Sequence, residues 1–271
     1  MPDTNPSYGS FRNTIPYVRV GSGKKTMLMF SGGPGNGLPA GLGLRFFTGS
    51  LKVFLDEYSL WIVTRICGMP PVYTTQDMSE DYAEMIQEEF GGHVAVAIGV
   101  SYGGMIMQHF AADHADLCDH LVIAMATHKL NPAGGQLDLR YASLLGQGKE
   151  RQAGVVIAEA LFPSGIQRRL AAAGLWLAGG AINYTISRSY NRDVLIEADA
   201  ELAHDSVESL KRITAPVLIL VGGSDFYFSA ESAQEMAAMI PSATLKIYPG
   251  KGHDILTEKR FADDIAEFIA R

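Results

Sequence analysis

The feature that most constrains the fold of this chain is a strand, a sharp turn and a helix in direct succession within residues 94–107. Residues Val94–Ile98 are small or β-branched and apolar, which is typical of a buried strand. Gly99, Ser101 and Gly103 follow in the spacing G-x-S-x-G, and a helical pattern begins at once. A turn this tight strains the serine backbone, and a β-carbon at either glycine would collide with the strand or the helix. We therefore predict that Ser101 is a nucleophile beside a helix N-terminus, whose dipole favours a developing negative charge.

A serine hydroxyl needs a base to take its proton, and His253 is the best placed of the seven histidines. It follows the last apolar strand, in a loop with Gly250 and Gly252 before it. Sites in open α/β sheets gather at such strand ends. His128 is the alternative base, because it borders the middle segment of the chain.

The imidazole needs an acceptor on its second nitrogen, and Asp225 is the candidate. It follows the apolar run Val217–Val221 through a glycine turn, although an aspartate in such a loop can also cap a turn or a helix. Asp254 adjoins the histidine, but neighbouring side chains point in different directions. The tetrahedral intermediate also needs preorganised N–H donors. We predict the backbone N–H groups of Tyr102 and Gly33, since Pro34 has none to give.

Strand and helix patterns alternate over most of the chain and predict an α/β fold with a mostly parallel sheet covered on both faces. We predict that the first 13 residues form a loose leader. The apolar segments at residues 17–20 and 26–30, joined by a glycine-rich turn, are predicted to form a hairpin. The alternation stops between 129 and 205, where only helical patches occur. We predict a core formed by 1–128 and 206–271, with 129–205 inserted as a helical cap near the catalytic edge.

Composition excludes several other classes of protein. The net charge is −7 and no basic stripe occurs, which disfavours nucleic-acid binding. Cys67 and Cys118 are the only cysteines and form no metal or disulfide pattern, so a reducing, cytoplasmic compartment is expected. No apolar run is long enough to span a membrane, and no signal peptide is recognisable. A homodimer is left open.

Together the segments Gly99–Gly104 and Ser31–Gly35, with Asp225 and His253, resemble the α/β-hydrolase superfamily. The Gly-Gly-Pro-Gly run is similar to the branch of proline iminopeptidases and related esterases. The resemblance implies acyl transfer to water through an acyl-enzyme, with no cofactor and no metal. One departure is Ser31, which stands where the family usually has histidine, so the hydrogen bonding of this loop must differ.

The inserted segment is rich in apolar side chains, most of which are expected to pack the cap onto the core. These are Leu161, Phe162, Leu170, Leu175, Trp176, Leu177, Ile182 and Tyr184. We predict that Trp176, Phe226 and Phe228 line a pocket for a small to medium, largely apolar ester or lactone. Three alternatives stay open: a C–C bond hydrolase or cofactor-free lyase or cyclase, a small-molecule receptor, and an aminopeptidase. In the last case Glu197, Asp199 and Glu201 would meet a free amino terminus.

Overall fold

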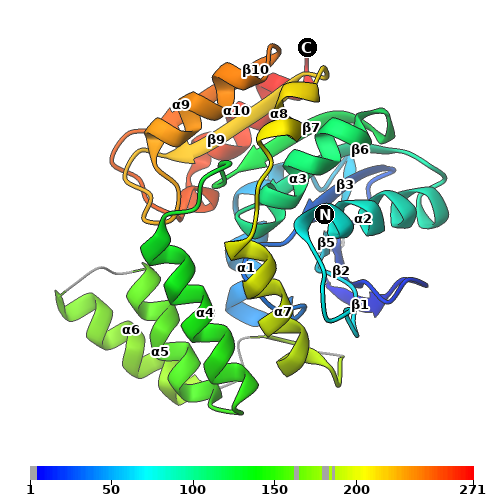
Figure 1. Cartoon of the computed structure of the whole chain (residues 1–271). Helices are drawn as coiled ribbons and strands as arrows, with labels where there is room; N and C mark the ends of the chain where they lie inside the picture. Colours follow the sequence, from blue (N-terminus) through cyan, green and yellow to red (C-terminus); the bar gives the residue numbers. More distant parts are fainter. Residues whose placement is uncertain (1–4, 162–164, 179–182, 185–186) are drawn as a thin grey trace.

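An eight-stranded sheet forms the centre of the computed structural model, which describes residues 5–161, 165–178, 183–184 and 187–271 (Figure 1). In spatial order the strands are β1 (Ser7–Ser10), β2 (Pro16–Val20), β5 (Tyr58–Val63), β3 (Lys25–Phe30), β6 (Val94–Val100), β7 (Cys118–Ala124), β9 (Val217–Gly222) and β10 (Ala243–Tyr248). Only the pairs β1–β2 and β2–β5 are antiparallel among these. The predicted mostly parallel α/β sheet is therefore confirmed.

The N-terminal edge of the sheet corrects two sequence predictions. The first residues are not simply a leader, because β1 pairs with β2. The predicted hairpin is wrong as well, since β5 lies between β2 and β3 and pairs with both. The link between β2 and β3 crosses the start of β5, where a β-carbon on Gly23 would lie 2.2 Å from the carbonyl carbon of Glu57. Local turn signals cannot reveal a third strand that enters later in the chain.

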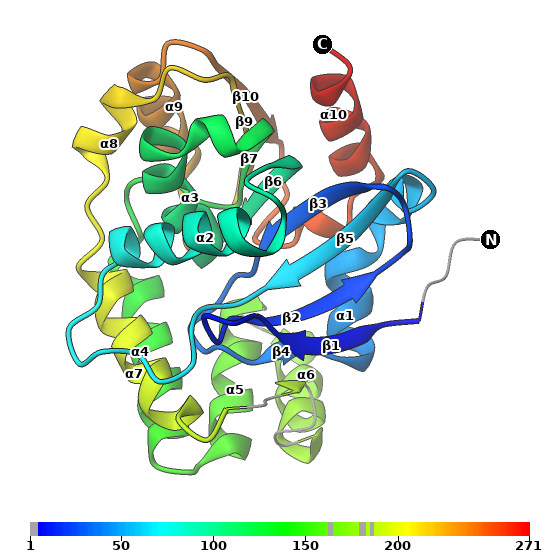
Figure 2. The same cartoon turned by 90° about the vertical axis from the view of Figure 1, so that its right-hand side faces the viewer.

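The strands divide their apolar side chains between two cores, one on each face. In β3, for example, Leu28 and Phe30 join one core and Met27 and Met29 join the other. Helices α2 (Thr75–Glu89), α3 (Tyr102–Asp113), α8 (Val207–Arg212) and α9 (Ala230–Met239) cover the first core. Helices α1 (Gly41–Thr48) and α10 (Lys259–Ile269) cover the second (Figure 2). This arrangement leaves the carboxyl ends of the parallel strands together at one edge of the sheet.

In the described part of the segment between β7 and α8, four helices are grouped beside the sheet (Figure 1). They are α4 (Pro132–Gly146), α5 (Glu150–Leu161), α6 (Gly165–Ala178) and α7 (Tyr190–Leu202). Ala142, Ala153 and Val194 belong to a small core of their own. Strand β8 (Asn183–Tyr184) pairs with β4 (Leu38–Pro39), which joins the segment to the loop after β3. Phe162 and Ile182 lie outside the described residues.

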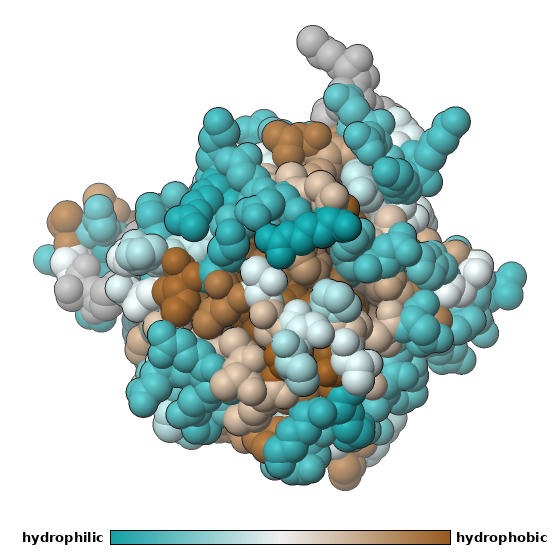
Figure 3. All heavy atoms as spheres, turned by 90° about the horizontal axis from the view of Figure 1, so that it is seen from above, coloured by the Kyte–Doolittle hydropathy of each residue, from teal (hydrophilic) through white to brown (hydrophobic). Residues whose placement is uncertain are grey.

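The face farthest from these four helices mixes hydrophilic side chains with smaller apolar areas (Figure 3). Within the described ranges, no helix combines the length and the hydropathy that a transmembrane span requires. Both cysteines, Cys67 and Cys118, are free thiols.

Candidate active site

Ser101 occupies the sharp corner between β6 and α3 in a conformation that few residues other than glycine adopt. Its φ is 53° and its ψ is −117°. The corner allows no side chain two positions before or after the serine: a β-carbon on Gly103 would lie 2.1 Å from the Phe30 carbonyl oxygen, and one on Gly99 would lie 2.5 Å from the Gly103 carbonyl oxygen. The Ser101 N–H donates to the Ala124 carbonyl at 2.9 Å, which anchors the corner to β7. The neighbouring glycines are therefore a steric requirement of this serine.

The structure brings Ser101, His253 and Asp225 into one hydrogen-bonded chain. His253 Nε2 lies 2.8 Å from Ser101 Oγ, and His253 Nδ1 lies 2.8 Å from Asp225 Oδ2. The Asp225 carboxylate is fully buried and the imidazole is 15% exposed. Asp225 Oδ1 accepts from the N–H groups of Tyr227 at 2.8 Å and Phe228 at 3.2 Å. Both oxygens of the carboxylate are thus used, and its orientation is fixed by its own loop.

The loops that carry Asp225 and His253 are joined by backbone hydrogen bonds. Gly223 N–H donates to the Tyr248 carbonyl and Ser224 N–H donates to the Lys251 carbonyl, each at 2.8 Å. These loops follow the adjacent parallel strands β9 and β10. The pairing of two strands therefore sets the separation between the carboxylate and the imidazole.

His128, the alternative base, lies elsewhere. It is buried, and its Nε2 lies 3.5 Å from Glu235 Oε2. Burial lowers the pKa of this imidazole. Among the described residues it is His253, and no other histidine, that hydrogen-bonds to Ser101 Oγ.

His204 lies at the other end of the inserted segment, and its surroundings predict that the free energy of unfolding decreases in acid. Its Nδ1 lies 2.8 Å from Thr75 Oγ1, while its buried Nε2 has no hydrogen-bond partner within the described ranges. Burial, followed by the charges of His109 and His128, lowers its pKa to about 3. An unfolded histidine titrates near 6.5. As the pH falls from 7 to 5, the unfolded chain gains a proton that native His204 does not, so this residue lowers the free energy of unfolding by about 2 kcal/mol.

We expect His204→Gln to remove this pH-dependent contribution to the free energy of unfolding. Urea unfolding at pH 7 and at pH 5 measures that free energy in the variant and in the wild type. The decrease in unfolding free energy should be about 2 kcal/mol smaller than in the wild type. His93→Gln is the matched control, because His93 is half exposed beside Asp119. Equal decreases in the wild type and His204→Gln would contradict the assignment.

The loop after β3 lies directly against the serine. A β-carbon on Gly32 would come within 2.9 Å of Ser101 Cβ, so only glycine permits this approach. Gly33 follows with a φ of 72°, in the left-handed region that glycine favours. Tyr102 is the first residue of α3, where backbone N–H groups have no partner within the helix. The two residues predicted as oxyanion donors thus flank the corner from the loop and from the helix.

The predicted pocket residues have different surroundings. The Phe228 ring is 1% exposed and its centroid lies 5.9 Å from that of His253. Phe226 is 39% exposed and packs on Tyr227. Trp176 is 44% exposed on α6, with the Arg151 guanidinium 4.9 Å from its ring centroid. The structure therefore brings Phe228 to the imidazole, but the described contacts of Trp176 are within the helical segment.

Sequence reasoning missed a buried ion pair beside the serine. Arg65, which follows β5, and Glu197 on α7 are both essentially inaccessible, and Arg65 Nη2 lies 2.6 Å from Glu197 Oε2. Burial alone would lower the pKa of Arg65, but Glu197, Tyr82 and Tyr102 together outweigh it and the net shift of the pKa is upward. Burial raises the pKa of Glu197, opposed by Arg65 and by the Gly35 N–H. A lone charged residue at a strand end does not reveal a partner 132 positions away.

A second unpredicted group links α4 to the histidine. The Tyr227 ring centroid lies 4.8 Å from that of His253, and Tyr227 Oη donates to Asp138 Oδ1 at 3.0 Å. Burial raises the pKa of Asp138 to about 6. It also raises the pKa of the neighbouring Glu201 well above its usual range. Helix α4 therefore places a carboxyl group one hydrogen bond away from the ring that packs beside the imidazole.

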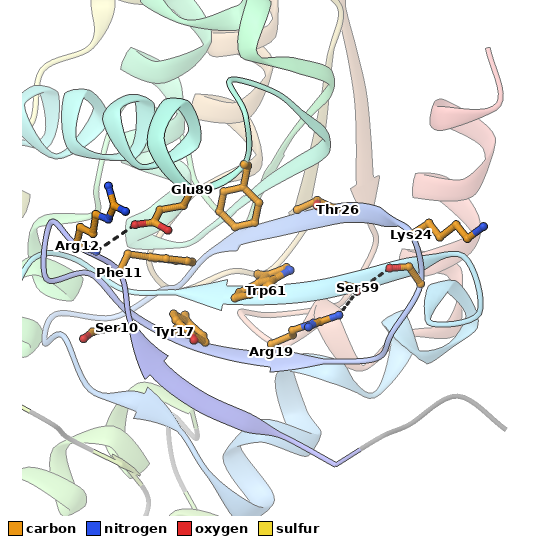
Figure 4. Close-up of a pocket in the computed structure, with 12 residues that line it drawn as sticks. Ser10, Phe11, Arg12, Tyr17, Arg19, Lys24, Thr26, Ser59, Trp61 and Glu89 are labelled. Carbon is orange, nitrogen blue, oxygen red and sulfur yellow. Dashed lines mark hydrogen bonds between the residues drawn. The ribbon is translucent and has the colours of Figure 1, made fainter.

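A separate cavity of about 500 Å³ lies over the antiparallel edge of the sheet (Figure 4). Aromatic residues including Phe11, Tyr17 and Trp61 line it. Arg19 Nη2 donates to Ser59 Oγ at 3.1 Å, and its guanidinium lies 5.2 Å from the Trp61 ring centroid. None of the residues that line it belongs to the group around Ser101. Within the described ranges, no set of three or more His, Cys, Asp or Glu side chains is arranged to hold a metal ion.

Comparison with known proteins agrees with this fold. A family model described as alpha/beta hydrolase fold matches residues 61–260. A non-heme chloroperoxidase from Burkholderia pyrrocinia is 27% identical over 195 residues, which cover 57% of this chain and 70% of that protein. An enol-lactonase from Burkholderia xenovorans LB400 superposes with a TM-score of 0.74 at 15% identity, covering 98% of this chain and 100% of its own. A hydrolase from Pseudomonas aeruginosa PA01 superposes with a TM-score of 0.72 at 20% identity, covering 98% and 99%.

Proposed function

The chain belongs to the α/β-hydrolase family, and from that premise we propose that it is a serine hydrolase of small to medium, largely apolar carboxylic esters or lactones. The observation that carries the proposal is the unbroken chain of two 2.8 Å hydrogen bonds from Ser101 Oγ through His253 to Asp225. In this account Ser101 is the nucleophile, His253 the base and Asp225 the residue that orients the base.

The reaction follows from these three side chains. His253 Nε2 takes the Ser101 proton as Oγ attacks the substrate carbonyl, and Asp225 stabilises the imidazolium that forms. The Gly33 and Tyr102 N–H groups stabilise the oxyanion of the tetrahedral intermediate. The imidazolium then protonates the leaving alkoxide, and an acyl-enzyme remains on Ser101. A water molecule, deprotonated by His253, releases the acid and restores the serine.

The preference for an apolar ester or lactone rests on the surroundings of the imidazole. Tyr227 and Phe228 pack beside His253, which favours an apolar acyl or alcohol group. The fold similarity to an enol-lactonase is consistent with this substrate class. We assign to the segment 129–205 the role of a helical cap, because its helix α4 reaches the histidine through the Asp138–Tyr227 hydrogen bond.

An aminopeptidase resembling the proline iminopeptidases has weaker support. Glu197 already binds Arg65 and the Gly35 N–H, and Asp199 is exposed. Of the three acidic residues considered as partners of a substrate amino group, only Glu201 is both buried and not paired with Arg65.

A substrate panel tests the proposal. It contains p-nitrophenyl esters of short acids, simple lactones and amino-acyl p-nitroanilides, each assayed with the wild-type chain. We expect turnover of short esters or lactones and negligible release of nitroaniline. Turnover of the anilides alone would support the peptidase. A compound that raises the melting temperature without any turnover would support a receptor instead.

A further inference from the structure

The loop predicted to bind the oxyanion is held by the buried Arg65–Glu197 pair. Arg65 Nη1 donates to the Ser31 carbonyl at 2.9 Å. The two hydrogens of Nη2 are shared among three acceptors, which are the Gly33 carbonyl at 2.7 Å, the Gly35 carbonyl at 2.6 Å and Glu197 Oε2. Glu197 accepts the Gly35 N–H with the same oxygen that receives Arg65. One guanidinium therefore contacts three carbonyl groups of this loop, and the Glu197 carboxylate binds both the guanidinium and the Gly35 N–H.

These contacts constrain the peptide group that carries the Gly33 N–H. That group joins Gly32 to Gly33, and Arg65 binds the carbonyl on each side of it, from Ser31 and from Gly33. Because the peptide units are planar, these two contacts fix the Cα atoms of Gly32 and Gly33, between which the middle unit lies. The position of the Gly33 N–H relative to Ser101 is thus set from outside the loop.

The same pair also reaches the second predicted donor. Tyr102 Oη donates to the backbone carbonyl of Glu197 at 2.9 Å. The Arg65 guanidinium lies 5.0 Å from the centroid of the Tyr102 ring, within the range of a cation–π contact. Both residues that supply oxyanion N–H groups are therefore attached to one ion pair.

Ser31 explains why the loop needs an external support. Its hydroxyl makes one contact among the described residues, to the Gly32 carbonyl at 3.5 Å, which is too long to orient a backbone. The family resemblance places histidine at this position. Here Arg65 at the end of β5 supplies the donors, and Glu197 extends the support to helix α7 of the inserted segment.

We propose that Arg65 and Glu197 are positioning residues that hold the Gly33 N–H in place to donate to the oxyanion. Because Glu197 lies on helix α7, the cap thereby contributes to stabilisation of the transition state. The inference rests on the proposed hydrolase function and extends it to a coupling between cap and catalysis. Such a positioning role differs from a purely structural one in its kinetic effect. A misplaced N–H donor weakens binding of the transition state more than binding of the substrate, so kcat falls while KM changes little.

The test compares the double variant Arg65→Met/Glu197→Gln with the wild type. Removing both charges avoids an unpaired buried charge, which would threaten the fold. With p-nitrophenyl butyrate, kcat should fall roughly 10²-fold or more, as when an oxyanion donor is lost. KM should change little, and the affinity for a trifluoromethyl ketone, which forms a tetrahedral adduct, should fall by a similar factor.

Asp193→Asn is the matched control, because Asp193 lies one turn away on α7 and is equally buried. It accepts from Asn36 Nδ2 and from the Gly68 and Met69 N–H groups, but it touches none of the three carbonyls. We expect it to lose stability while kcat stays within a few-fold. A folded double variant with wild-type kcat and ketone affinity would overturn the inference.

Hydrogen exchange of the backbone amides in residues 31–35 provides a readout that needs no turnover. The double variant should exchange these amides faster than Asp193→Asn does, and equal rates would overturn the inference. If the wild type hydrolyses no ester or lactone, the proposed function fails, and this comparison still decides whether the pair holds the loop.

Discussion

Replacing Ser101 with alanine should lower the rate of ester hydrolysis by about 10⁴-fold or more, because no other group can form the acyl-enzyme. The residual rate comes from substrate binding and the oxyanion donors alone. Alanine tolerates the φ of 53° about as well as serine does, so the melting temperature should change little. Steady-state kinetics with the best ester of the panel, together with thermal unfolding, measures both quantities.

Ser224→Ala is the matched control for this substitution. Ser224 is an exposed serine in the loop that carries Asp225. Its replacement removes the same hydroxyl group close to the site and should leave kcat/KM within a few-fold. An S101A enzyme that retains more than about one hundredth of the wild-type rate would show that another group carries the reaction.

The second large effect is expected for Asp225→Asn, which should reduce kcat by about 10⁴-fold. Two backbone N–H groups, from Tyr227 and Phe228, point at Asp225 Oδ1. The amide oxygen of asparagine will occupy that position, so its NH₂ group will face His253 Nδ1. The imidazole must then carry its proton on Nε2, where it cannot accept one from Ser101.

The pH dependence distinguishes this cause from a loss of structure. In the asparagine variant, the residual rate should rise with hydroxide concentration, since solvent base must replace the histidine. Asp254→Asn removes the same charge from an exposed neighbour of His253 and should leave kcat nearly unchanged. An Asp225→Asn enzyme with a tenth of the wild-type activity would remove Asp225 from the mechanism.

Local chemistry made much of the fold and the site predictable. The corner at Ser101 depends on glycines that stand two positions away, so five consecutive residues carried the prediction. His253 and Asp225 follow apolar strands, and parallel strands bring their carboxyl ends together at one edge. The four helices between β7 and α8 were also recognisable, because each has its own apolar periodicity. The mostly parallel sheet followed from the alternation of strands and helices.

What could not be predicted depends on contacts between distant segments. The position of β5 between β2 and β3 arises from pairing that no local turn encodes. Arg65 and Glu197 carry no motif, and only the folded chain places the guanidinium under the loop at Ser31. The contact between the Trp176 ring and the Arg151 guanidinium was also not predictable, because the two residues lie on different helices, α6 and α5.

The measurement that tests the central claim most directly is labelling of the wild-type protein with a fluorophosphonate, followed by peptide mapping. A serine activated by His253 should be modified stoichiometrically, and the adduct should map to Ser101. Ser101→Ala should remain unlabelled. A wild-type protein that stays unmodified, or an adduct on a different residue, would contradict the assignment of Ser101 as the nucleophile.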